Sequence, residues 1–284
     1  MEELIKQVHT FYHDFPIVLG MTVVFSVAER FFPAGAQKSF KGWVFNFIHI
    51  GLPVSLASIL WGVIAGTSIA ALGNHFGLGF IDLRFSTAGG TPYLILTVLL
   101  ATFIFDFFYY WFHRTLHESR FLWHVHKLHH MDEQLSATTN GRSHVLEELG
   151  RVPMIAIPTA ILFKLNPDVG GVIGYAITMW SIFFHANLRL NLGPAGLLFY
   201  GPQGHRIHHS RLREHHDKNY AAYFPVWDIL FGTYHHPKRD EFPPTGLHDE
   251  PEITSFSETL VLPFRAWRKM FRDWRGHNTA LSNQ

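Results

Sequence analysis

The sequence has no cysteine among its 284 residues. This absence excludes disulfides, thiolate-ligated haem, and zinc fingers or iron–sulfur clusters held by cysteine. It says little about the redox compartment, because a cysteine-free chain is compatible with either side of a membrane. Histidine, aspartate and glutamate are left as the side chains that could bind a metal.

Charged residues are also scarce. They make up 16% of the chain, against about 25% in soluble proteins, whereas 48% of the residues are hydrophobic. The net charge of +1 gives no sign of a nucleic-acid partner. The N-terminus lacks the basic segment and small-residue cleavage pattern of a signal peptide. The C-terminus shows no lipidation or retention motif.

Long stretches with few charges take the place of the missing polar residues. A helix that crosses a bilayer needs about 20 apolar residues. The candidate stretches are residues 15–32, 43–72, 92–112, and the pair 152–165 and 172–184. These stretches predict an all-α integral membrane bundle of about four to five membrane helices, with a cytosolic helical cap. The alternative is a soluble all-α protein with buried helices.

The pair of stretches within residues 152–184 predicts a membrane hairpin, which returns the chain to the side it left. Of the 23 lysines and arginines, 17 lie in residues 113–151 and 189–275. The positive-inside rule therefore places this side in the cytoplasm. We expect a multi-pass protein of a bacterial inner membrane or the endoplasmic reticulum.

Three regions follow from this organisation. Residues 1–92 are expected to form N-terminal membrane helices, and residues 93–236 a catalytic domain that includes the hairpin. Residues 237–284 form a tail with an amphipathic helix over about 255–275. This helix could lie in the interface of an anionic leaflet, or it could pack on the cytosolic cap.

Histidine is the abundant residue, with 21 copies, of which 15 lie between positions 113 and 236. Three clusters have the pattern HxxxH or HxxHH. They are His113–His117, His126–His130 and His205–His209. Residues spaced by three or four lie on the same side of a helix. Each cluster therefore presents two or three imidazoles in one direction, as a metal site requires.

Nine histidines are predicted metal ligands, and His144 is a tenth candidate. The nine are His113, His117, His126, His129, His130, His185, His205, His208 and His209. One metal takes about four to six protein ligands, so this number implies two metals. Imidazole suits iron, zinc and copper. The segment beginning His117-Glu118 lacks the second histidine of a zinc protease motif.

Two carboxylates are expected to support the ligands. Asp106 lies on the same helical stripe as His113 and His117. A carboxylate there could accept a hydrogen bond from a ligand imidazole, or it could pair with a backbone donor or another helix. Glu147 is close in sequence to His144 and could support the same site. Four histidines near the third cluster could also serve as supporting residues. They are His215, His216, His235 and His236.

The order HxxxH, HxxHH, lone histidine and HxxHH resembles the fatty acid hydroxylase and sterol desaturase superfamily. The segment Trp227-Asp-Ile-Leu-Phe-Gly-Thr-Tyr234 resembles its closing signature, and Arg142-Ser-His144 with Glu147 resembles a stretch between its histidine clusters. The resemblance covers residues 94–234. It departs at Arg189, where fatty acid 2-hydroxylases have a histidine, and no cytochrome b5-like segment is present. Both departures favour the sterol desaturase-like branch.

The resemblance implies a membrane-bound non-haem di-iron oxygenase. Two iron ions would be the cofactors, with zinc possible in purified protein, and O2 would be the co-substrate. A lipid would be hydroxylated or desaturated. Electrons would come from an external donor, either cytochrome b5-like or a ferredoxin with its reductase. The alternatives are a membrane zinc-dependent hydrolase and a histidine-rich metal-binding or transport protein.

Overall fold

The computed structural model describes residues 2–51, 53, 55, 56, 75–82, 90–164, 167–248 and 250–282. The helices are α1 (Glu2–Phe31), α2 (Phe40–Val44), α4 (Gly90–Glu118), α5 (Arg120–His130), α6 (Val145–Arg151), α7 (Ile157–Leu162), α8 (Pro167–His185), α9 (Pro202–His208), α10 (Val226–Phe231) and α11 (Phe256–Ser282). Shorter 3-10 and π turns are η1 (Phe45–Gly51), η3 (Ala137–Gly141), η4 (Val152–Ala156), η5 (Gly193–Leu197) and η6 (Arg213–His215). Two strands, β1 (Ile81–Asp82) and β2 (Phe163–Lys164), pair in parallel. The expected mostly helical fold is confirmed.

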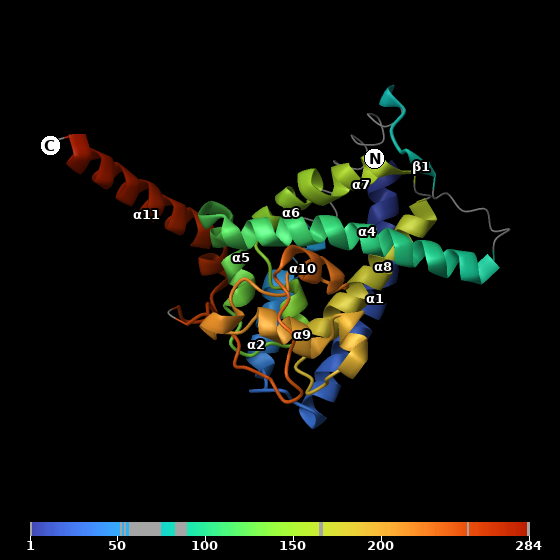
Figure 1. Cartoon of the computed structure of the whole chain (residues 1–284), viewed down its shortest axis with the longest axis horizontal. Helices are drawn as coiled ribbons and strands as arrows, with labels where there is room; N and C mark the ends of the chain where they lie inside the picture. Colours follow the sequence, from blue (N-terminus) through green and yellow to red (C-terminus); the bar gives the residue numbers. More distant parts are fainter. Residues whose placement is uncertain are drawn as a thin grey trace.

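Helix α4 runs across the middle of the molecule, and its N-terminal end extends beyond the neighbouring elements (Figure 1). Within the described ranges it is the one helix long and apolar enough to cross a membrane. Leu96 in its first half is 62% exposed, whereas Asp106, Tyr110 and His113 in its second half are buried. The exposed half is thus suited to an apolar surrounding, and the other half carries polar residues into the core.

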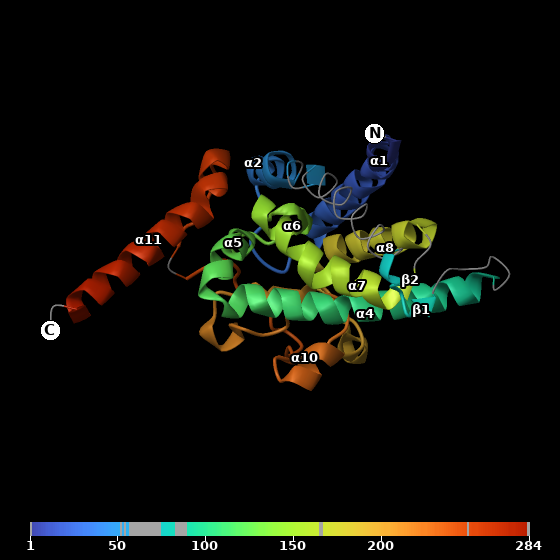
Figure 2. The ribbon, with the colours of Figure 1, turned by 90° about the horizontal axis from the view of Figure 1, so that it is seen from above.

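The segment predicted as a hairpin is built from η4, α7 and α8, and these elements lie alongside α4 (Figure 2). Pro153 and Pro158 have no N–H to donate, which explains why the first arm is interrupted by the π turn η4. The bundle of four to five membrane helices and the cytosolic cap stay predictions. Most of the stretch predicted at residues 43–72 lies outside the described residues.

Helix α1 contains the stretch predicted at residues 15–32 but begins at Glu2. It packs against α8 and η3. Near its end, the buried Glu29 accepts hydrogen bonds from the backbone N–H groups of Ala137 and Asn187. One carboxylate thereby joins α1 to the segments that follow the second histidine cluster and His185.

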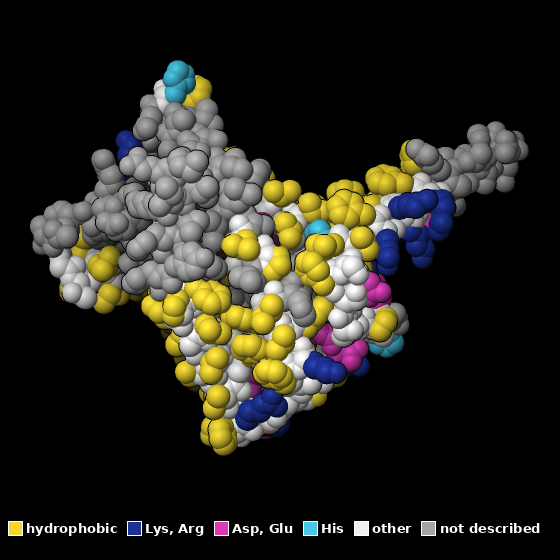
Figure 3. Space-filling view, turned by 180° about the vertical axis from the view of Figure 1, so that it is seen from behind, with side chains coloured by type: hydrophobic (Ala, Val, Ile, Leu, Met, Phe, Trp, Pro, Cys, Tyr) yellow, Lys and Arg dark blue, Asp and Glu magenta, His cyan; other side chains and the backbone are white. Residues whose placement is uncertain are grey.

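Helix α11 projects from the body and packs mainly against α5 and η1 (Figures 1 and 2). The rings of Trp267 and Phe121 stack with centroids 4.2 Å apart, and Trp267 Nε1 donates to the Phe121 carbonyl. Apolar and basic side chains lie on different sides of this helix (Figure 3). The amphipathic helix expected at residues 255–275 is therefore present.

Candidate metal centre

The histidine clusters lie where α4, α5, α8 and α9 meet. Helix α4 ends at Glu118, and α5 begins at once because Ser119 Oγ accepts a hydrogen bond from the backbone N–H of Leu122. This short turn folds the second cluster back onto the first. Helix α9 begins at Pro202, a residue favoured in the first turn because its missing N–H has no helical partner. That helix presents the third cluster.

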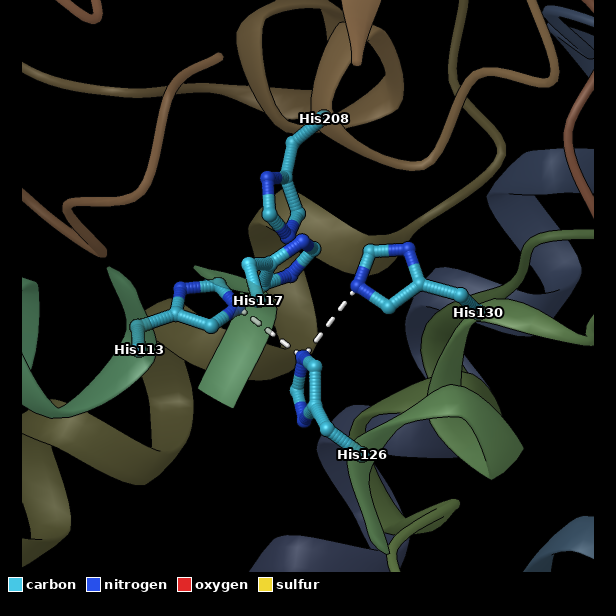
Figure 4. A group of neighbouring side chains, drawn as sticks. All are labelled: His113, His117, His126, His130 and His208. Atoms are coloured by element: carbon cyan, nitrogen blue, oxygen red, sulfur yellow. Dashed lines mark hydrogen bonds between the residues drawn. The ribbon is translucent and has the colours of Figure 1, made fainter. Parts of the chain in front are cut away.

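Five imidazoles form the first group, and they point toward one another (Figure 4). They belong to His113, His117, His126, His130 and His208, and their ligand atoms lie within 4.8 Å of one another. His126 Nε2 is 3.0 Å from His113 Nε2 and 3.2 Å from His130 Nε2. Each of the three histidine clusters contributes to this group.

Four imidazoles form the second group. They belong to His129, His185, His205 and His209, and their ligand atoms also lie within 4.8 Å of one another. His185 Nε2 is 3.2 Å from His129 Nε2 and 2.9 Å from His205 Nε2, which is 3.0 Å from His209 Nε2. The second and third clusters are therefore divided between the two groups, and His185 joins only the second.

In five of these rings, the nitrogen that points away from the group, Nδ1, binds a hydrogen-bond acceptor. This contact fixes the tautomer of the ring. The Nδ1 atoms of His113, His129, His185 and His208 donate to the carbonyls of Tyr220, Arg142, Ser181 and Lys218. His126 Nδ1 is 2.9 Å from Glu147 Oε2. A carbonyl accepts only, so each Nδ1 carries the hydrogen, and in a neutral ring Nε2 then has a lone pair.

These lone pairs face one another at short range. His113 Nε2 and His126 Nε2 are 3.0 Å apart, and neither has a hydrogen to share when both rings are neutral. The His129–His185 pair repeats this arrangement at 3.2 Å. Facing lone pairs repel unless a cation lies between them. The donor set therefore fits a bound metal ion in both groups.

Burial favours the neutral form of the imidazoles whose pKa it lowers. Burial, together with the neighbouring histidines, lowers the pKa of His130 and His209 well below its usual range. Burial likewise lowers the pKa of His208 to about 3. The buried Nε2 atoms of His117 and His208 have no hydrogen-bond partner. A metal would satisfy these orphaned atoms, because neutral imidazole is the form that binds metal.

The structure thus brings together nine of the ten predicted histidines and leaves out His144. His144 caps the start of α6, where its Nδ1 accepts from the backbone N–H of Leu146. Its Nε2 donates to the carbonyl of Leu260 in α11. Both ring nitrogens are therefore occupied, and His144 lies outside both groups.

Asp106 does not accept a hydrogen bond from a ligand imidazole, which was one of the two roles expected for it. Its partners are backbone N–H groups, as in the other. It accepts from Ala222, Tyr223 and Phe224. Asp228 belongs to the closing signature. It accepts hydrogen bonds from the backbone N–H groups of Tyr220 and Ala221, the two residues before Ala222. The two buried carboxylates together hold residues 220–224, and the Tyr220 carbonyl in turn orients His113. Asp106 therefore acts on the centre indirectly.

Glu147 lies beside an imidazole of the first group, and its role as a supporting residue stays a prediction. Its Oε2 contacts His126 and its Oε1 accepts from Arg151 at 3.2 Å. Burial alone would raise the pKa of Glu147, but the adjacent His126 and the Arg151 guanidinium outweigh it and lower that pKa. The carboxylate therefore stays ionised behind His126, where it can raise the basicity of this ring.

Several supporting groups were not identified from the sequence. Four are backbone carbonyls, which carry no sequence signal. Asp217 is a fifth: it accepts from the Tyr220 hydroxyl, and its Oδ1 is 3.8 Å from His117 Nδ1. Asp217 has φ of 59°, a left-handed conformation that aspartate tolerates better than most residues. An aspartate two residues before Asn219, which has φ of 58°, could have indicated a tight turn there.

A cavity of about 310 Å³ borders the first group. It is lined by His117, Trp123, His130, His208, Ser210, His216, Asp217, Gly246 and Leu247. Ligand pockets typically span about 300–1,000 Å³. The cavity is therefore large enough for water or dioxygen and small for a whole lipid.

The fatty acid hydroxylase family matches residues 98–233, which contain all the histidines of both groups. Alkylglycerol monooxygenase of Caenorhabditis elegans is 34% identical over 152 residues, covering 53% of this chain and 29% of that protein. Ornithine lipid hydroxylase of Rhizobium tropici is 33% identical over 167 residues, covering 59% of this chain and 50% of that protein. Human alkylglycerol monooxygenase is 37% identical over 129 residues, covering 45% of this chain and 28% of that protein.

The chain thus spans half or less of the length of these curated relatives. No solved structure shows a significant match. The matched region coincides with the elements that carry the two imidazole groups. Residues 98–233 match the fatty acid hydroxylase family, and the curated relatives that match this region are proteins of the same superfamily.

Proposed function

We propose that the protein is a membrane-bound, O2-dependent non-haem di-iron enzyme that hydroxylates a lipid. The observation that carries this proposal is the pair of buried groups of neutral imidazoles whose lone pairs converge. Several relatives are named as a monooxygenase or a hydroxylase of lipids, which favours hydroxylation over the related desaturation.

The first iron would be held by His113, His117, His126, His130 and His208, and the second by His129, His185, His205 and His209. When bound, the two irons would supply the activation of dioxygen needed to oxidise a C–H bond that side-chain acid–base chemistry cannot attack. Five and four imidazoles leave positions open on ions that take about six ligands. The all-nitrogen donor set and the absence of cysteine ligands are compatible with iron, and zinc could replace it in purified protein.

The protein residues have a positioning role in this proposal. The acceptors behind five of the rings hold each imidazole in the tautomer that directs Nε2 inward. Buried aromatic and apolar residues around the centre, such as Tyr110 and Ile207, exclude bulk water. The cavity beside His117 offers a route for small molecules. Electrons would come from an external donor, either cytochrome b5-like or a ferredoxin with its reductase.

The hydrolase alternative needs a carboxylate base beside an open zinc position. Glu147 is the buried carboxylate that contacts a ring of the first group, and it binds the outer nitrogen of His126 and the Arg151 guanidinium. It therefore lies behind a ligand and is not directed at the metal. This placement supports the oxygenase over the hydrolase.

The test uses membranes that contain the full chain, a reducing system, labelled ¹⁸O2 and a panel of ether, ornithine-type, sterol and fatty acyl lipids. We expect one lipid class to gain an oxygen atom from O2. His208→Ala removes a ligand of the first group and His129→Ala one of the second, so each variant should abolish the product and lower the bound iron. His124→Ala is the matched control, since His124 lies in α5 but outside both groups.

Product formation that persists without oxygen, or in both ligand variants, would contradict the proposal. Removal of hydrogen with no incorporated ¹⁸O would instead identify a desaturase that uses the same centre.

A further inference from the structure

A third group of metal-binding side chains lies outside the nine-histidine centre. It consists of His215 at the end of η6, and His235 and Glu241 in the segment that follows α10. Their ligand atoms lie within 4.8 Å of one another. None of the three belongs to the two groups assigned above, and none of them is needed for the proposed oxygenation.

The spacing of these atoms suits a shared ion. His215 Nε2 is 3.2 Å from Glu241 Oε1, and His235 Nε2 is 3.3 Å from Glu241 Oε2. Ligands about 2.0–2.2 Å from a tetrahedral ion are separated by roughly 3.2–3.6 Å. Direct N–H···O hydrogen bonds are most often about 2.9–3.0 Å long. The observed separations therefore fall within the range for a shared ion and at the long end for hydrogen bonds.

The surrounding residues orient the side chains of His215 and Glu241 and hold the backbone of His235. Ser210 Oγ is 2.9 Å from His215 Nδ1 and can accept its hydrogen, which leaves a lone pair on Nε2 facing Glu241. Asn219 holds His235 by donating to its carbonyl and accepting from its N–H. Glu241 Oε2 accepts from the backbone N–H of Lys238 at 2.8 Å. Two of the ligand side chains and the backbone of the third are thus held in place before any ion binds.

We propose that His215, His235 and Glu241 bind one divalent transition-metal ion, with zinc as the ion that two imidazoles and one carboxylate suit best. The side chain of His215 is 2% exposed, whereas those of His235 and Glu241 are 25% and 20% exposed. One coordination position therefore faces solvent and can hold water. The site exchanges its ion more readily than the buried nine-histidine centre.

The ion would connect the segment after the third histidine cluster to the segment after α10. Ser210 directly follows His209, and its hydroxyl contacts the ring of His215. The backbone of Ser210 also forms a β-bridge with Thr245. Zinc at this place would therefore stabilise the end of α9, which carries ligands of both imidazole groups. The role is a structural one, at a distance from the reacting atoms.

The experiment measures zinc by mass spectrometry in the purified full chain, after saturation with Zn²⁺ and removal of free metal. His235→Ala should bind one equivalent of zinc per chain fewer than the unchanged protein, and the isosteric Glu241→Gln should do the same. The matched control is His236→Ala, which removes the adjacent exposed imidazole and should bind as much zinc as the unchanged protein. Thermal melts in chelator check that all three variants are folded.

The difference in zinc between variants does not depend on the state of the nine-histidine centre. If that centre binds no metal, the protein still loses its one equivalent in His235→Ala, so the two proposals fail separately. Equal zinc in the unchanged protein and in both ligand variants would overturn the third site. Loss of zinc in His236→Ala as well would show unspecific surface binding and would overturn it too.

Discussion

The five histidines with fixed tautomers differ in what lies behind them. Four donate to backbone carbonyls, and His126 alone donates to a carboxylate. A carboxylate is the stronger acceptor, because it is charged and raises the electron density on the opposite nitrogen. His126 should therefore be the strongest electron donor to a metal among these five imidazoles.

Replacing Glu147 with Gln tests this inference. The amide keeps the shape of the side chain but removes the charge behind His126, so metal affinity should fall by about 10- to 100-fold. Competition with a chelator of known affinity measures the loss. The control is Glu148→Gln, since Glu148 contacts Arg151 in the same turn of α6 and lies outside the imidazole groups. Equal affinity in both variants would contradict a role for Glu147.

Among single residues, the nine histidines that lie together could be predicted from the sequence. The residues that orient their rings were harder to predict. The nine histidines share regular spacings, which helical periodicity makes visible. His144 lies next to Glu147 in space but caps a helix, and such a role depends on where the helix begins. Asp106 lies on the predicted stripe, yet its partners come from residues more than a hundred positions away. Contacts of this range leave no local pattern.

Among the elements, α5 shows how helical geometry divides a cluster. His126 and His130 are four residues apart and lie about 40° from each other around the helix, so they share the first group. His129 lies about 100° from His130 and reaches the second group. The sequence pattern predicted one face for all three residues. Only the position of α8, which brings His185 next to His129, shows that His129 belongs to the second group.

Helix α11 provides a test at the level of an element. Phe264, Phe271 and Trp274 are 52%, 52% and 63% exposed. Basic residues lie on another side of the helix (Figure 3). We expect the apolar side to enter the interface of an anionic membrane. The cysteine-free chain allows a single polarity-sensitive fluorophore to be attached at Phe271→Cys. Its emission should shift to the blue when the protein is moved from detergent to anionic nanodiscs.

The matched position is Lys269→Cys, which lies about 160° away around the same helix. Its emission should change little. If both positions shift equally, or neither does, α11 packs elsewhere and the membrane role is wrong.

For the whole molecule, α4 joins an apolar half to a half that carries His113 and His117. The distribution of lysine and arginine predicts that the ligand side faces the cytoplasm. Asp240→Cys, an exposed position on that side, should then react with an impermeant maleimide only from the cytoplasm. Thr91→Cys, at the opposite end of α4, should react only from the other side. Labelling of both positions from one side would show that α4 does not cross the membrane.

The overall architecture was less predictable than the metal centre. Hydropathy identified α4 because its apolar run is long and contains one charge. The hairpin arms are short, and prolines in the first arm introduce a π turn, so length and composition alone do not settle whether they span a bilayer. The number of spans, the three sequence regions and the cytosolic cap remain predictions.

The division of adjacent histidines between the two groups has a thermodynamic consequence. His129 and His130 are consecutive in α5, and His208 and His209 are consecutive at the end of α9, yet each pair supplies one ligand to each group. Neither backbone segment can be ordered around one ion without also ordering a ligand of the other. The entropy lost when the first ion binds is therefore not lost again for the second. We expect the two ions to load with positive cooperativity, so that half-filled centres are rarer than two independent sites would give.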